Sequence, residues 1–419
     1  MRAVQLVVIA LGAGLGVFYP FLAVILSERG LDPGAIGLVF AVSAVGFTVA
    51  VPLWGHLADV RLGRARALIV CAVGAGAAVL LLLAPLPTIG IAACVLAFSF
   101  FESAWQPLGD AISINAVADR RRDYARIRVL ASISFALVAI GAGQLYDLTG
   151  YAPASILFAV CALLMAIAAW YVPDIDRADL EAHAPGAATP SVASAGGSHP
   201  RPSRRPRPPR WPTWRFGSTG VALRLEPRLG LVMLAVGLVH VGIMGGFTFL
   251  PLRLVALGGS PGDIALMSGL SAAAEIPAML LAATVATRIG LRGMFVGASL
   301  LYGACIVSWT VIDTPVLLIA TRALTGVAFA GFIVSIVLTI ATLLPATLQA
   351  TGQALYQTIG FGVASIAGNA LGGLVYGSLG HTAFFAMGAA LAFVAAGVGW
   401  FAVPGRAGPS PAVAAAQVG

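Results

Sequence analysis

Two carboxylates inside a long apolar run are the residues of this chain best suited to chemistry. Glu102 and Asp110 lie in a run that begins near Thr88 and is long enough to cross a hydrocarbon core of about 30 Å. Gln106 stands four residues from each, so a helix carries all three on one face. A carboxylate facing lipid costs at least ~2.5–3.5 kcal/mol. This face is therefore expected to meet a protein interior or a water-filled path, where an acid carries a proton or binds a solute.

Arginines follow this face directly. Five stand within nine residues, namely Arg120, Arg121, Arg122, Arg126 and Arg128, and a new apolar run then begins. The pattern predicts a polar membrane helix, a cytoplasmic turn and a returning helix. Arg120 to Arg122 are expected to set the topology rather than to contact a ligand. A simpler alternative for Glu102 is that it lies near a helix end and snorkels to the interface.

The later part of the chain holds three more ionisable residues inside apolar runs: His240, Glu275 and Arg322. A buried Glu275–Arg322 pair would relieve both charges and let Glu275 carry a proton, although a purely structural pair explains the same residues. For His240 the alternative is an ordinary packed, hydrogen-bonded side chain. Tyr19, beside Pro20 in the first apolar run, either lines a solute path or packs in the interior.

Composition places the chain among membrane proteins. Of 419 residues, 59% are hydrophobic and 10% are charged, and the mean hydropathy of +0.97 is more than a soluble protein tolerates on its surface. The expected fold is an all-α membrane protein with twelve transmembrane helices. The segments are 3–27, 35–57, 67–86, 88–116, 127–147, 152–172, 229–257, 264–287, 294–312, 315–343, 351–377 and 382–403.

The net charge of +8 could suggest nucleic acid, but the positions of the charges argue against it. All 24 basic residues are arginine, and with twelve crossings and an inside N-terminus 21 of them fall on the cytoplasmic side. Only Arg29 and Arg253 lie near the outer side, and Arg322 lies within a helix. This positive-inside bias predicts a multi-pass protein of the cell inner membrane with both termini in the cytoplasm.

Several classes of function lack their motifs. The four cysteines lie inside apolar runs without metal-ligand spacing and are expected to be structural: Cys71, Cys94, Cys161 and Cys305. No GxxxxGK[ST] loop is present, so ATP-driven pumping is unsupported. No nucleophile constellation is present either, so we expect neither an enzyme nor a bound cofactor or metal. The N-terminal apolar region is too long for a signal peptide and is expected to be a retained first helix.

Residues 173–228 break the apolar pattern. They are rich in Pro, Ala, Ser and Arg and cannot form an apolar core, so a disordered cytoplasmic linker is expected. Its basic part carries Trp211, Trp214 and Phe216 and is expected to contact anionic lipid.

The part after this linker repeats the part before it at an offset near 230 residues. Tyr146-x-x-x-Gly150 recurs as Tyr376-x-x-x-Gly380, and Pro33-Gly34-x-Ile36 recurs as Pro261-Gly262-x-Ile264. The spacing predicts two pseudo-symmetric six-helix bundles. The expected domains are the N-terminal bundle 1–172, the linker 173–228, the C-terminal bundle 229–403 and a cytoplasmic tail 404–419.

The connection between the second and third helices reads GHLADVRLGRARAL, residues 55–68. It resembles the signature loop of the major facilitator superfamily, in which a helix-ending glycine and an aspartate precede a basic turn. The resemblance implies a cytoplasmic latch between the two bundles at Gly55, Asp59, Gly63, Arg64 and Arg66. Val60 separates Asp59 from Arg61, which makes the turn one residue longer than the family pattern.

PLGDA, followed by DYARIRVLASISFAL, resembles the branch of the superfamily that contains phenylpropionate and nucleoside permeases and is related to the lactose permease. In the lactose permease an acid on the fourth helix pairs with an arginine on the fifth, and the sugar binds between them. Asp110 and Arg128 occupy the matching places, so the resemblance implies a solute site at this pair. The competing interpretation is a structural ion pair near the cytoplasmic surface.

The resemblance extends into the C-terminal half. Ala274-Glu275-Ile276-Pro277 is similar to the eighth-helix motif of the branch, and residues 342–376 match the junction of the tenth and eleventh helices. It implies that Tyr356, Gln357 and Asn369 line the cavity. The lactose permease has a His and a Glu after the basic residue of its tenth helix. This chain has Thr325 and Ala328 there, so that proton site cannot be copied.

We therefore expect a monomeric secondary transporter that works by alternating access and moves a small polar or aromatic organic solute together with protons. The candidate proton carriers are Glu102, Asp110 and Glu275, with Arg128 and Arg322 as partners. The alternative is proton-coupled efflux of drugs or metabolites by antiport. It is disfavoured because residues 139–144, AIGAGQ, lack the proline of the efflux motif. A non-transporting receptor on the same fold is a third class.

Overall fold

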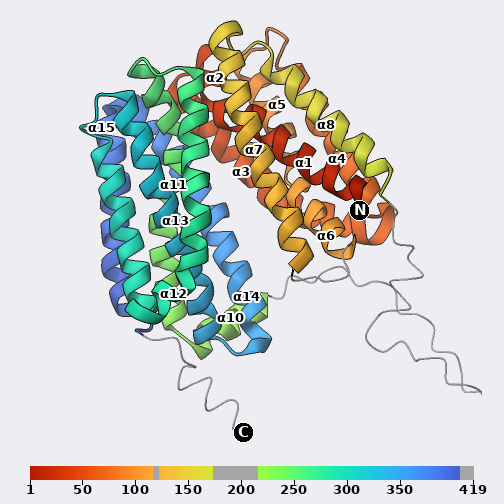
Figure 1. Ribbon diagram of the computed structural model, residues 1–419. Helices are drawn as coiled ribbons and strands as arrows, with labels where there is room; N and C mark the ends of the chain where they lie inside the picture. The colour runs from red at the N-terminus through yellow and green to blue at the C-terminus, as the bar shows by residue number, and fades with distance from the viewer. Residues whose placement is uncertain (117–121, 173–215, 406–419) are drawn as a thin grey trace, which may run out of the picture.

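The computed structural model describes residues 1–116, 122–172 and 216–405. All regular secondary structure in these residues is helical (Figure 1). The elements are α1 (Arg2–Phe18), η1 (Tyr19–Phe21), α2 (Leu22–Glu28), α3 (Pro33–Leu57), η2 (Ala58–Leu62), α4 (Arg64–Leu81), α5 (Thr88–Glu102), α6 (Trp105–Ala116), α7 (Arg122–Thr149), α8 (Ala154–Trp170), α10 (Phe216–Leu225), α11 (Arg228–Ala256), α12 (Pro261–Ser308), α13 (Pro315–Leu343), α14 (Ala346–Gln357), η3 (Thr358–Val363) and α15 (Ala364–Ala402).

Twelve membrane crossings fit these helices. Ten spans among the described residues are long and apolar enough to cross a bilayer, and α8 is a shorter apolar helix. One of the ten, Thr347–Ala402, is two helices in a row, because α15 breaks at Gly380, where φ is +84°. The left-handed backbone that such a break needs is open to glycine at little strain. The predicted fold class is confirmed. The predicted linker lies outside the described residues up to 215, and its last part forms α10 and the start of α11.

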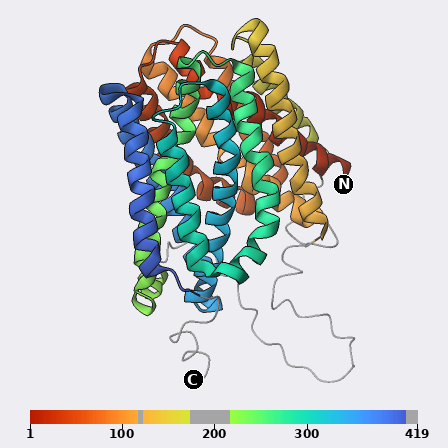
Figure 2. The ribbon, with the colours of Figure 1, turned by 60° about the vertical axis from the view of Figure 1, so that its left-hand side comes forward.

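The first group of helices, α1 to α8, packs around α1, which contacts both α7 and α8. The second group, α11 to α15, is held by contacts of α12 with α13 and of α11 and α12 with α15. Figure 1 shows the groups as two bundles, and in Figure 2 the green-to-blue helices stand in front of the first bundle. We call them the N bundle and the C bundle.

Glycine geometry supports the internal repeat. The described residues have positive φ only at glycines, and these six glycines fall into pairs: Gly30 with Gly258, Gly63 with Gly290, and Gly150 with Gly380. The members of the pairs are 228, 227 and 230 residues apart. The two bundles therefore turn the chain at matching places, as a duplicated unit would.

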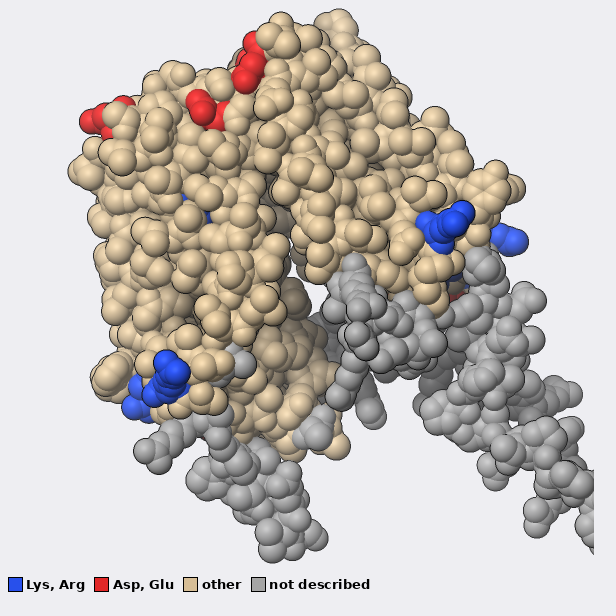
Figure 3. All heavy atoms as spheres, in the orientation of Figure 1, with Lys and Arg blue, Asp and Glu red and all other residues tan. Residues whose placement is uncertain are grey.

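The two ends of the molecule differ in charge. In Figure 3 acidic side chains lie along the upper edge and arginines lie lower down. We call the upper end, where α2 ends and α3 and α12 begin, the acidic end; its carboxylates are Glu28, Asp32, Asp147, Asp263 and Asp313. We call the opposite end, where η2 joins α4 and α12 bends at Gly290, the arginine end.

The bundles meet along two seams at the acidic end. In the first seam α7 packs on α12, and in the second α3 packs on α15. Both seams depend on glycine: a Cβ added to Gly143 would lie 2.9 Å from the Pro261 carbonyl oxygen, and one added to Gly37 would lie 2.7 Å from the Gly373 Cα. Towards the arginine end a hollow separates the bundles (Figure 3). The molecule is thus closed at one end and open towards the other.

Gly12 tests the close packing of α1 on α7. A Cβ at Gly12 would collide with the Ala131 carbonyl oxygen and the Ser134 hydroxyl. Gly12→Ala should therefore push the helices apart and destabilise the N bundle by about 1–3 kcal/mol. Thermal unfolding in detergent measures this loss. Gly141→Ala on α7 is the matched control, since nothing lies within 4 Å of its added Cβ. Equal unfolding temperatures for the two variants would contradict the packing argument.

Candidate functional site

A cavity of about 330 Å³ lies between the bundles. The C bundle supplies most of its wall, from α11, α12, α13 and α15, and the N bundle adds residues of η1, α2, α3 and α7. Its aromatic lining residues are Tyr19, Phe40, Phe135, Phe247, Tyr302 and Phe329, and its uncharged polar ones are Thr248, Ser268, Ser271, Ser365 and Asn369. Two of the lining residues that the structure describes are charged, Glu275 and Arg322. Aromatic walls with a few polar groups are typical of sites for small organic ligands.

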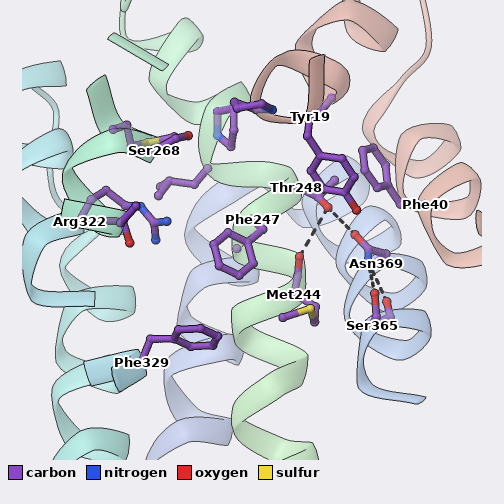
Figure 4. Close-up of a pocket in the computed structure, with 18 of the residues that line it drawn as sticks. Tyr19, Phe40, Met244, Phe247, Thr248, Ser268, Arg322, Phe329, Ser365 and Asn369 are labelled. Atoms are coloured by element: carbon purple, nitrogen blue, oxygen red, sulfur yellow. Dashed lines mark hydrogen bonds between the residues drawn. The ribbon is translucent and has the colours of Figure 1, made fainter. Parts of the chain in front are cut away.

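Arg322 of α13 is the most constrained charge in the cavity. Only 7% of the residue is exposed, and one terminal nitrogen donates a 3.0 Å hydrogen bond to the Thr325 hydroxyl. The guanidinium lies 5.3 Å from the centre of the Phe247 ring, as a cation–π contact requires. Its Nε is buried without a hydrogen-bond partner among the described residues. Figure 4 shows Arg322 and Phe247 directed into the cavity from neighbouring helices.

Glu275 of α12 shares this cavity with Arg322. Tyr302, which follows on the second arm of α12, feels the charges of both. The structure thus places a carboxyl group, a guanidinium and a phenol from two helices around one space. A carboxylate and a guanidinium in such a place compensate each other and can exchange hydrogen bonds with a polar solute.

On the opposite wall a polar network joins α11 to α15 (Figure 4). Thr248 Oγ1 donates a 2.6 Å hydrogen bond to Asn369 Oδ1, and Asn369 Nδ2 donates to the Ser365 carbonyl and hydroxyl oxygens at 2.8 and 3.3 Å. Asn369 lines the cavity, and its amide nitrogen already donates within the protein. The amide therefore ties two helices together at the cavity wall.

The N-bundle acids predicted from sequence lie elsewhere. Glu102 is the last residue of α5, and a turn at Ser103 and Ala104 leads into α6 within one span, Thr88–Ile114. The predicted common face of Glu102, Gln106 and Asp110 therefore stays a prediction. Gln106 Nε2 donates a 2.8 Å hydrogen bond to Asp110 Oδ1 on α6.

Among the described N-bundle residues that were predicted to line the solute path, Tyr19 alone lines the cavity. It is 51% exposed, lines the space from η1, and lies near enough to Glu102 to feel its charge. Glu102, Gln106 and Asp110 are absent from the cavity wall. The Arg128 side chain lies outside the described residues, so its pairing with Asp110 stays a prediction.

His240 and Tyr356 lie together in the C bundle, away from the cavity wall. His240 is fully buried, its Nδ1 donates a 3.0 Å hydrogen bond to the Val236 carbonyl, and its ring packs against Phe332, Tyr356 and Phe361. The packed alternative describes this environment well. Gln357 is exposed where α14 passes into the π-helix η3.

The predicted latch residues lie where α3 ends and α4 begins. Asp59 lies in the π-helix η2 and pairs with Arg64 at 3.5 Å, and Gly63 between them has a φ of +81°. Gly55, on α3, and Arg66, on α4, belong to the same part of the N bundle. The loop is therefore braced within its own bundle in this conformation.

Sequence reasoning missed the aromatic wall of the cavity. Phe40, Phe247, Phe329 and Tyr302 stand in apolar helices, where a ring that lines a space and a ring that packs look alike. Arg322 was the signal that could have led to Phe247. Among the described residues no group of three His, Cys, Asp or Glu side chains could hold a metal ion. The four cysteines are free thiols.

Comparison with known proteins gives consistent results. Residues 6–387 match the family described as "MFS_1 like family". The maltose permease of Geobacillus stearothermophilus is 26% identical over 353 residues, which are 83% of this chain and 80% of that protein. The putative nucleoside transporter YegT of Escherichia coli (strain K12) is 28% identical over 156 residues, 36% of each chain.

Solved structures match this one over a larger share of the chain. The nucleoside transporter NupG superposes with a TM-score of 0.78 at 16% identity, covering 96% of this chain and 98% of that one. The peptide transporter POT in complex with sulfate superposes with a TM-score of 0.67 at 13% identity, covering 95% and 93%. At these identities the structural likeness establishes the fold.

Thr248→Val tests the polar network at the cavity wall. The variant keeps the side-chain shape and leaves Asn369 Oδ1 without its 2.6 Å donor, which should lower the free energy of unfolding by about 1–3 kcal/mol. Thermal unfolding measures the loss. Thr358→Val is the control, because that exposed hydroxyl bonds only to the Ala354 carbonyl of its own helical turn. A Thr248→Val protein as stable as the control would mean that the network does not join the helices.

Proposed function

The chain belongs to the MFS_1 like family, within the major facilitator superfamily of transporters, and we propose that it moves a small organic solute across the cell membrane by proton-coupled symport. Its fold and family make it a secondary transporter rather than an enzyme. The observation that carries the proposal is the membrane-embedded cavity between the bundles, with Glu275 and Arg322 in its wall. Charges inside a membrane protein are costly and typically mark solute or proton pathways.

Alternating access is supported by the shape of the molecule. Both seams close the acidic end, and the hollow opens towards the arginine end (Figure 3). The arginine bias of the connections supports a cytoplasmic position for that open end. The structure is therefore assigned to a cytoplasm-open state, and rocking of the bundles around the cavity would give the opposite state.

The substrate is proposed to be a nucleoside or a small sugar. The relatives are named as a maltose permease and as nucleoside transporters. The cavity of about 330 Å³ suits a solute of that size, and its aromatic rings can stack on a base or a sugar ring. The guanidinium of Arg322, which lines the cavity, would donate to an acceptor oxygen or ring nitrogen of the solute.

Glu275 is the proposed proton carrier, since it is the described acid that lines the cavity. When it is protonated it adds a donor to the site, and when it is ionised it compensates Arg322. Glu102, next to Tyr19, and the Asp110–Arg128 pair are secondary candidates in the N bundle. Asp59 with its loop is proposed to latch the cytoplasmic side when that side closes. The protein is proposed to act as a monomer, with anionic lipid at the basic segment before α10.

Glu275→Gln tests proton coupling. In proteoliposomes with an acidic outside, the wild type should accumulate labelled uridine or maltose against its gradient, and the variant should not, because it cannot release a proton. Exchange of labelled for unlabelled solute should persist in the variant. Glu28→Gln, at the exposed acidic end, serves as the control. Full accumulation by Glu275→Gln would remove this residue from coupling, and wild-type efflux driven by the same gradient would favour antiport.

Arg322→Lys tests the solute contact. Lysine keeps the charge but loses the flat guanidinium and its fork of donors, so the KM for uptake should rise about tenfold or more. The measurement is initial uptake rate against solute concentration. Arg292→Lys is the control, since Arg292 bonds to the Val403 carbonyl away from the cavity. An unchanged KM for Arg322→Lys would show that the solute does not use this residue.

A further inference from the structure

Asp147 of the N bundle bonds directly to the C bundle. Its carboxylate Oδ1 accepts a 2.9 Å hydrogen bond from the backbone N–H of Gly262, across the first seam. Gly262 is in the first turn of α12, whose N-terminal amides carry partial positive charge. The bond therefore combines a hydrogen bond with an attraction between a carboxylate and a helix end.

The position of Asp147 is unfavourable for its own helix. It lies in the last turn of α7, and this turn contains no basic residue. The C-terminal end of a helix carries partial negative charge and disfavours an acid by a few tenths of a kcal/mol to about 1 kcal/mol. Local helix energetics thus give no reason for an aspartate here. Such a local conflict is expected where a residue serves another purpose.

The start of α12 is built so that the Gly262 amide remains for Asp147. Pro261 has no N–H, and the Asp263 amide donates to the Ser260 hydroxyl. Asp263 in turn accepts from the Ser260 amide through its own carboxylate. The first turn is therefore capped from within its own bundle, apart from the one N–H that points across the seam.

Close approach of the backbones brings the carboxylate within reach. One turn before Asp147, a Cβ added to Gly143 would lie 2.7 Å from the Ala265 Cβ and 3.0 Å from the Gly262 Cα. A Cβ added to Gly262 would itself lie 2.6 Å from Asp147 Oδ2. Tyr151 lies close enough to feel the charges of both Asp147 and Glu28. The contact exists only while α7 and α12 stay together.

The second seam provides an internal comparison. Gly34 opens α3 as Gly262 opens α12, and the repeat spacing that pairs Tyr146 with Tyr376 pairs Asp147 with Gly377. The geometry matches, because a Cβ added to Gly377 would lie 3.5 Å from the Gly34 amide nitrogen. Gly377 has no side chain to accept that hydrogen. The same joint is thus made twice, and the carboxylate is supplied to the first seam alone.

We propose that Asp147 is a conformational latch that holds the acidic end closed and biases the protein towards its cytoplasm-open state. Opening of the acidic end separates α7 from α12 and breaks the 2.9 Å bond, which is exposed to water already in the closed state. Because water then replaces the bond, the latch shifts the balance of the two states rather than fixing it. The proposal rests on alternating access, but not on the substrate or on proton coupling.

The test measures the two states directly, without transport. Nitroxide labels at Ile89→Cys on the N bundle and Val311→Cys on the C bundle, both exposed at the acidic end, report the separation by pulsed electron resonance. The four native cysteines are replaced by alanine. Asp147→Ala should raise the ratio of open to closed acidic end roughly three- to tenfold. Asp147→Asn, which keeps an acceptor without the charge, should give a smaller rise.

Asp313→Asn is the matched control. Asp313 is an exposed carboxylate at the same end, but its 2.9 Å partner, Arg253, belongs to its own bundle. This variant should leave the distance distribution unchanged. An Asp147→Ala protein with the wild-type distribution would overturn the latch.

A gain-of-function variant gives the opposite reading. Gly377→Asn would offer the Gly34 amide an acceptor in the second seam without a new charge beside Asp32, and its Cβ would meet only ordinary contacts. It should lower the open fraction and restore closure when combined with Asp147→Ala. If Asp147→Ala alone fails to fold, the Gly377→Asn variant provides the test. An open fraction of the acidic end in Gly377→Asn that equals or exceeds that of the wild type overturns the proposal. Absent uptake with intact distance shifts would refute the transport proposal and leave the latch standing.

Discussion

The absence of water in the hydrocarbon core is the constraint on which this structure depends. Backbone groups must bond within helices, and charges must gather at the ends of the molecule or around a protected space. Most charged residues lie at the ends of the molecule, with carboxylates at one end and arginines at the other. Arg322 and Glu275 instead lie around a protected space, the cavity between the bundles. The proposed chemistry follows from this placement, because a polar solute can supply hydrogen-bond partners to these charged groups and lipid cannot.

Close approach of helices has to replace hydrophobic collapse as the source of packing in lipid. Glycine provides it within the N bundle, where Gly12 faces the backbone of α7, and between the bundles, where Gly37 faces Gly373. Contacts of the second kind join the two bundles, so the proposed rocking of the bundles would break and remake them as units. A single polar contact such as that of Asp147 with Gly262 can then weigh on the whole equilibrium.

The relatives show how little sequence this fold needs. NupG superposes over almost the whole chain at 16% identity, and POT does so at 13%. Many different apolar residues can build a membrane helix of the right length. Residues around the cavity are under a different constraint, the shape and polarity of a solute. Likeness of fold therefore leaves the solute open, and the named relatives transport solutes of different kinds.

The sequence by itself determined the membrane class, the number of crossings and the repeat. Hydropathy and helix-breaking glycines are local properties that accumulate along the chain, so Gly150 and Gly380 could be matched before any packing was known. The common face of Glu102, Gln106 and Asp110 was a local inference too. It stays a prediction, because a turn at Ser103 and Ala104 lies between Glu102 on α5 and the other two residues on α6.

Only the tertiary structure decided which polar groups meet. Asp147 and Gly262 are 115 residues apart, and Thr248 and Asn369 are 121 apart. Whether such residues touch depends on how each helix is rotated and how closely its glycines let a neighbour approach. Those quantities come from packing over many residues at once, and no short stretch of sequence contains them.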